Sequence, residues 1–162
     1  AGAVYVFERD GEGTWRETAR IGGVRAAVVR ADLDGDRLLV GHPQADGGGA
    51  AVLYGRADDG RWHRLTTFRP AVPYADGAFG TTVRLRDRRA LVVGYTEQVG
   101  LDFNIDRVVY VFGYGEGGWE QQQVVDLGAW AFGAAMDHDG RRALIGQASE
   151  AEPGAAYLVD LR

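Results

Sequence analysis

Short apolar segments alternate with polar, glycine-rich turns along the whole chain. The apolar segments are rich in Val, Leu, Tyr and Phe, and clusters of Pro, Gly and Asp separate them. No 3.6-residue periodicity lasts for the length of a helix, whereas short β-branched and aromatic runs bounded by turn residues are typical of strands. The pattern therefore predicts an all-β fold.

The apolar segments recur in a fixed order. One kind has the form of "AVYVF" at 3–7 and contains a Tyr, and a Trp follows its first three copies. A second kind ends on Gly, in "RLLVG" at 37–41, "ALVVG" at 90–94 and "ALIG" at 143–146. The repeated aromatic residues are Tyr5, Tyr54, Tyr110 and Tyr157, with Trp15, Trp62 and Trp119.

A third kind of segment precedes the glycine-ended ones: "VRAAV" at 24–28, "FGTTV" at 79–83 and "FGAAM" at 132–136. A unit of four short strands with a period of about fifty residues is typical of one β-propeller blade. The units span approximately 1–23, 24–70, 71–131 and 132–162. They predict about three blades of four antiparallel strands plus one strand, thirteen strands in all, which is a partial propeller.

Both faces of the Tyr-containing strands are apolar. In "AVYVF", Tyr5 and Phe7 point to one side, and Val4 and Val6 point to the other. Such a strand fits between two neighbouring blades, and we interpret the repeated Tyr and Trp residues as core packing. The Trp-led strands, such as "WEQQQVV", are more polar, which favours the outer edge of a blade.

Composition excludes several classes of protein. The 162 residues suit a single domain, and the net charge of -5 argues against nucleic-acid binding, which needs a basic face. No apolar run is long enough to span a membrane. The chain has no Cys, so a disulfide framework and a thiol nucleophile are excluded.

The ordered motifs "FGxxV", "DG", "LLVG", "GxVYVF" and "GxW" resemble the FG-GAP repeats of integrin α-chain propellers. The "YVFER-x-G-x-W" segment is more similar to bacterial-type FG-GAP proteins, although "GHP", "GYT" and "GQA" replace the usual "GAP". The resemblance implies an integrin-like β-propeller with a role in protein binding or cell adhesion. It also implies an extracellular or cell-surface location, and it does not imply an enzyme.

The turn "DLDGD" at 32–36 carries three alternating carboxylates, Asp32, Asp34 and Asp36. In the FG-GAP family this turn can hold calcium, so calcium is the one cofactor that the pattern leaves open. A calcium loop needs further oxygen ligands, but Arg37 and Leu38 follow. We therefore favour a hairpin in which Asp-Gly supplies the positive φ angles of a type I′ turn. His138, between two Asp residues, is likewise interpreted as part of a solvated turn.

Strand order places all the longer loops at one end of the predicted blades, and binding residues commonly lie on such loops. The candidate ligand contacts on this loop-rich face are His42, Tyr74, Tyr95, Glu97, Asp102, Phe103, Asn104 and Trp130. The alternative for three of them, Tyr74, Phe103 and Trp130, is that they cap the core between blades.

Catalysis has little support in the sequence. Ser149 is the only Ser, and none of the three His residues lies in a recognisable nucleophile motif. We therefore expect a non-catalytic protein-interaction or adhesion module that uses the loop-rich face. The alternative is a lectin-like propeller that binds a glycan.

Three blades alone would leave two apolar blade faces uncovered. We therefore expect that the chain does not act as an isolated monomer. Because it starts at Ala1 and within a blade, we favour the remainder of a longer propeller chain as the partner, with self-association as the alternative.

Overall fold

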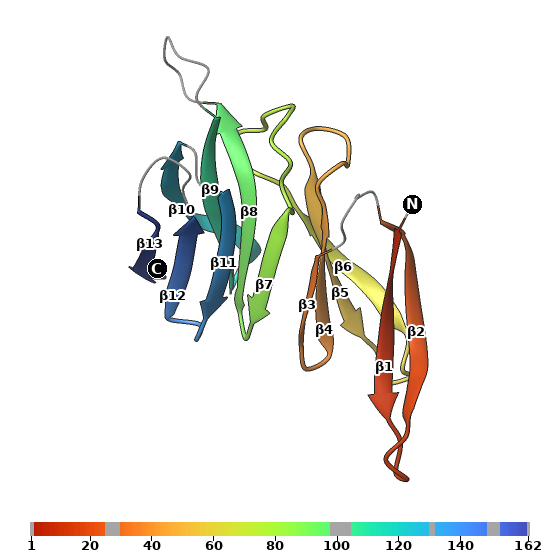
Figure 1. The fold of residues 1–162 in the computed structure, drawn as a ribbon. Coiled ribbons are helices and arrows are strands. Elements are labelled where there is room, and N and C mark those ends of the chain that lie inside the picture. Colours follow the sequence, from red (N-terminus) through yellow and green to blue (C-terminus); the bar gives the residue numbers. More distant parts are fainter. Residues whose placement is uncertain (1, 25–29, 98–104, 130–131, 149–152, 162) are drawn as a thin grey trace.

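The computed structural model describes residues 2–24, 30–97, 105–129, 132–148 and 153–161. These residues form thirteen β-strands in four antiparallel sheets, and Figure 1 shows how the strands are arranged. The described residues contain no helix that could span a membrane. The predicted all-β fold and the predicted number of strands are therefore confirmed.

Each sheet is built from strands that are consecutive in the chain. The N-terminal sheet pairs β1 (Gly2–Arg9) with β2 (Trp15–Val24). The second sheet has the order β3 (Ala31–Asp34), β4 (Arg37–His42), β5 (Ala50–Arg56), β6 (Trp62–Phe68). The third sheet has the order β7 (Thr82–Arg86), β8 (Arg89–Glu97), β9 (Ile105–Gly115), β10 (Gly118–Ala129). The C-terminal sheet has the order β11 (Phe132–His138), β12 (Arg142–Ala148), β13 (Ala155–Asp160).

The sheets meet in a propeller-like way. The first strand of the second sheet, β3, contacts β7 of the third sheet, and β7 contacts β11 of the C-terminal sheet. The Trp-led strands β6 and β10 lie at the opposite edges of their sheets. The first strands of neighbouring blades therefore lie together. The polar Trp-led strands lie at the other edge of each sheet, as the sequence predicts.

Apolar side chains fill the space between successive sheets. On β4 and β5, Leu38 and Val40 face the N-terminal sheet, whereas Leu39 and Leu53 belong to a cluster shared with the third sheet. A further cluster joins Val93 of the third sheet to Ile145 of the C-terminal sheet. Because neighbouring residues of a strand point to opposite faces, an apolar run buries both faces of a blade at once.

The "FG" motif before β7 explains how the second and third sheets fit together. Phe79 is buried, and its ring lies 5.1 Å from the ring of Tyr110. Gly80 has a φ of +102°, and a Cβ added there would lie 2.4 Å from the carbonyl oxygen of Ala50. The motif thus combines an aromatic side chain that fills the gap with a glycine that permits close approach of the backbones.

Two sequence interpretations are corrected. The sequence predicts that Val24 opens the first strand of its unit, but Val24 ends β2. Residues 25–29 lie outside the described residues, and the first described strand of the second sheet is β3. Trp15, expected in the core, is 66% exposed. Trp62 and Trp119 each pack against an apolar cluster that includes residues of the preceding sheet. Trp15 lies in the first sheet, and no described sheet precedes it to cover its ring.

Candidate functional site

Three of the candidates predicted on the loop-rich face lie close together. The amide of Gly77 donates to the carbonyl of Tyr74 at 2.9 Å, and the amide of Tyr95 donates to the carbonyl of Gly77 at 2.6 Å. A Cβ on Gly80 would lie 3.0 Å from the amide nitrogen of His42. Backbone contacts of the segment between β6 and β7 with β4 and β8 therefore gather His42, Tyr74 and Tyr95 at this end of the molecule.

Their side chains are held in different ways. The guanidinium of Arg107 lies over the ring of Tyr95, 5.1 Å from its centroid, and donates to its hydroxyl at 2.7 Å. Burial lowers the pKa of His42, and the positive charge of Arg64 adds to the effect. His42 is therefore biased towards its neutral form.

The remaining loop candidates are only partly covered by the structure. Glu97 ends β8, and its side chain is outside the description. Asp102, Phe103, Asn104 and Trp130 lie outside the described residues. Their role as ligand contacts stays a prediction.

The carboxylates at 32–36 join two sheets. The amide of Leu85 in β7 donates to Asp32 Oδ2 at 2.7 Å, and the amide of Asp87 donates to Asp34 Oδ2 at 2.6 Å. Arg37 also donates to Asp34 Oδ2, at 3.1 Å. These hydrogen bonds fasten the β3–β4 hairpin to the next blade, and no group of three or more potential metal ligands occurs within the described ranges.

The hairpin itself is confirmed, but its turn type differs from the prediction. Asp34 pairs with Arg37, so the loop consists of Gly35 and Asp36. Gly35 has a φ of 57°, and Asp36 has no positive φ. A type I′ turn needs positive φ at both central residues, whereas a type II′ turn needs it only at the first, where Gly is favoured. The backbone therefore fits a type II′ turn.

We expect calcium to bind this turn weakly at most. Oxygens of Asp32 and Asp34 already accept amide hydrogen bonds, and Arg37 would repel a cation. Calorimetric titration of the chain with calcium should give no saturable heat in the micromolar range. Micromolar binding that disappears in Asp34→Ala would contradict this expectation.

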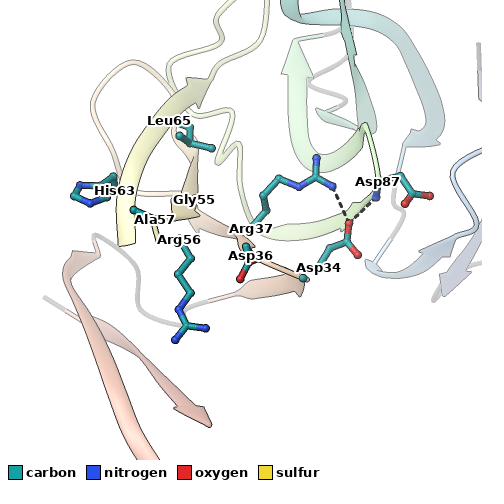
Figure 2. Close-up of a pocket in the computed structure, with 10 residues that line it drawn as sticks. Asp34, Asp36, Arg37, Gly55, Arg56, Ala57, His63, Leu65 and Asp87 are labelled. Atoms are coloured by element: carbon teal, nitrogen blue, oxygen red, sulfur yellow. Dashed lines mark hydrogen bonds and ion pairs between the residues drawn. The ribbon is translucent and has the colours of Figure 1, made fainter. Parts of the chain in front are cut away.

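A hollow of about 620 Å³ opens at the end opposite the loop-rich face. Figure 2 shows the residues that line it. The β3–β4 turn, the end of β5, the start of β6 and Asp87 of the β7–β8 turn surround it. Gly55, Ala57 and Leu65 form an apolar part of the lining. Charged and polar side chains complete it: Asp34, Asp36, Arg37, Arg56, His63 and Asp87.

Leu65 is the exposed apolar side chain in this hollow. Leu53 pairs with Thr66 and Tyr54 pairs with Arg64, so Leu65 is the extra residue of a β-bulge. It is 57% exposed, and a Cβ on Gly55 would lie 2.8 Å from its Cδ1. The bulge thus turns Leu65 over the glycine of the neighbouring strand.

The same bulge recurs in the other blades that have a Trp-led strand. Shifts in register leave Thr18 as the extra residue in β2 and Gln122 as the extra residue in β10. All three bulged residues stand three positions after the repeated Trp. The position is polar in two units and apolar at Leu65. Sequence reasoning missed Leu65, although alignment of the units on Trp would have revealed the difference.

His138 occupies a second hollow, between the β7–β8 turn and the β11–β12 hairpin. It is buried, which corrects the expectation of a solvated turn. The amide of Gly140 donates to its Nδ1 at 3.3 Å, and its Nε2 has no hydrogen-bond partner within the described part of the chain. Burial lowers the pKa of His138, and nearby charges modify the effect: Asp137, Asp32 and Asp139 favour the protonated form and Arg86 opposes it.

We expect the stability of the chain to fall when the pH is lowered from about 7.5 to about 5. The folded-state pKa of His138 lies below the ordinary value of 6.5, so the unfolded chain binds the proton first as the pH falls. His42 acts in the same direction. Urea midpoints at the two pH values should therefore differ less in His138→Gln than in the wild type. The exposed His63 provides the control. If His63→Gln reduces the difference between the two urea midpoints as much as His138→Gln does, the pH dependence does not come from His138.

The fold and these two hollows define a propeller-like all-β protein with open hollows of mixed polarity. No protein family, curated protein or solved structure that was compared with the chain matches it. The resemblance to FG-GAP repeats therefore rests on the sequence motifs alone.

Proposed function

We propose that this chain is a non-catalytic interaction module that binds a protein or peptide partner. The observation that carries the proposal is the exposed, bulged Leu65 in an open hollow with charged residues around it. Apolar contact area bordered by charged and polar groups is typical of protein-binding surfaces. An adhesion role at the cell surface is consistent with this proposal and comes from the FG-GAP resemblance.

The charged residues around the hollow are partly engaged in the fold. Asp34 accepts hydrogen bonds from Arg37 and from the amide of Asp87, and Arg56 forms an ion pair with Glu8 at 2.9 Å. Groups held in this way suit the recognition of a partner, because their geometry is fixed before binding. A lectin-like function would more naturally use an exposed aromatic ring, and the lining contains no Phe, Tyr or Trp among the residues described.

The loop-rich face remains the second predicted contact surface, and a single set of variants compares the two ends. A partner captured from the native source by the immobilised chain would be purified and titrated against each variant. Leu65→Gln installs the residue type of the equivalent bulge, and Tyr74→Ala alters the loop-rich face. Leu33→Gln, at an exposed leucine that does not line the hollow, is the control.

We expect Leu65→Gln to weaken binding about tenfold, because the variant loses apolar surface that a partner would bury and adds an amide that must be desolvated. Leu33→Gln should leave the dissociation constant unchanged. Loss of binding in Tyr74→Ala alone would place the contact on the loop-rich face. A glycan array run in parallel tests the alternative, and specific glycan binding without a protein partner would overturn the proposal.

A further inference from the structure

The outward face of the N-terminal sheet carries three exposed aromatic side chains. Tyr5 is 49% exposed, Phe7 is 52% exposed, and Trp15 lies beside them on β2. We call this surface the N-face. Val4 and Val6 point the other way, into the cluster shared with the second sheet. The N-face is therefore the side of the sheet that no described blade covers.

The equivalent residues of the third sheet show what such a face packs against. Tyr110 and Phe112 occupy the same places in "VVYVF" and are buried. They lie in one cluster with Leu39 and Leu53 of the preceding sheet. Trp119 also belongs to this face and packs against Phe68, with ring centroids 5.3 Å apart. An aromatic face of this kind is thus covered, inside the chain, by a leucine-bearing face of the blade before it.

The C-terminal sheet presents such a leucine-bearing face to solvent. Leu144 and Leu158 are paired across β12 and β13, as Leu39 and Leu53 are paired across β4 and β5. The inner pair is fully buried, whereas Leu144 is 55% exposed and Leu158 is 66% exposed. We call this surface the C-face. It has the same cross-strand leucine pair that covers the aromatic face of the third sheet.

We propose that copies of this chain associate head to tail, with the N-face of one copy packed on the C-face of another. One molecule carries both halves of an interface that it already forms internally, so a second copy is the occupant that the two faces fit. The contact continues the stacking of the blades, at the spacing of about 10 Å that is usual for packed sheets. Because the two faces differ, the contact is heterologous, and it closes a ring or extends a chain of copies.

The charged residues of the two faces complement each other. Cross-strand pairing places Arg9 and Arg20 on the N-face together with Glu17. It places Asp137 and Asp160 on the C-face together with Arg142. The N-face therefore has an excess of positive charge and the C-face an excess of negative charge. Pairing of two N-faces or two C-faces would bring like charges together, which disfavours a symmetric contact.

Sedimentation velocity of the purified 162-residue chain, from micromolar to near-millimolar concentration, tests the proposal. The wild type should form species larger than the monomer. An N-face variant, Tyr5→Thr with Phe7→Thr, and a C-face variant, Leu144→Thr with Leu158→Thr, should each remain monomeric. Thr suits exposed strand positions, and circular dichroism checks that both variants fold. Leu33→Thr is the control and should associate like the wild type.

Mixing the two variants gives the decisive result. The N-face variant keeps an intact C-face and the C-face variant keeps an intact N-face, so the mixture should form a dimer although neither variant associates alone. A wild type that stays monomeric throughout would overturn the proposal. Association of either variant alone, or a mixture that remains monomeric, would overturn it as well, because the contact would then not join N-face to C-face.

Discussion

Phe112→Ala should lower the free energy of unfolding by about 3–5 kcal/mol, the usual cost of removing a fully buried Phe. Phe112 is only 4% exposed, and its ring lies 4.7 Å from Phe68 and 6.1 Å from Phe79. The substitution leaves a cavity between the second and third sheets that the surrounding strands can fill only in part. Urea unfolding followed by circular dichroism measures the loss.

Phe7→Ala is the matched control, because Phe7 holds the same place in the repeat but lies on the exposed N-face. It should cost about 1 kcal/mol or less when measured at a concentration where copies are dissociated. Equal losses for the two variants would show that Phe7 is as buried as Phe112, or that the second and third sheets do not pack as described.

Gly80→Ala should be among the most destabilising small substitutions in the chain. The positive φ of Gly80 alone costs an L-residue about 1–2 kcal/mol. The added Cβ would also lie 2.4 Å from the carbonyl oxygen of Ala50, which is backbone and cannot turn aside. The backbones of the second and third sheets would then have to separate. We expect a loss clearly greater than the φ penalty, again from denaturant midpoints.

Gly118→Ala separates the two contributions. Gly118 has a φ of +99°, nearly that of Gly80, but a Cβ there would meet no atom within 4 Å. The free energy of unfolding of this variant should fall by only about 1–2 kcal/mol, which is the cost of the backbone conformation. If Gly80→Ala costs no more than Gly118→Ala, the close approach of the two sheets is wrong.

The architecture could be predicted from the sequence because each strand has a short-range signature that repeats. The Tyr and Phe of "VVYVF" alternate with Val, and this alternation assigns the two faces of a central strand without knowledge of the neighbours. The burial of Tyr110 and the exposure of Tyr5 could not be separated in the same way. The two residues have the same local sequence, and only the presence of a preceding blade distinguishes them.

The candidate site was harder to predict because it depends on contacts between distant segments. Asp34 has the spacing of a calcium ligand, but its carboxylate accepts the amide of Asp87 from the next blade. His138 stands in a turn-like sequence, yet the packing of two hairpins buries it. Leu65 looks like an ordinary strand residue until the register of β5 and β6 shows that it is bulged.

The sheets stack as blades, with the aromatic face of the third sheet packed on the second. The most direct measurement is the nuclear Overhauser effect between the rings of Phe68 and Phe112 in the folded chain. These rings belong to different sheets, β6 and β9, and their centroids lie 4.7 Å apart. We predict a strong cross-peak between their ring protons. Strong cross-peaks between paired strands within each sheet, with none between these two rings, would contradict the stacked arrangement.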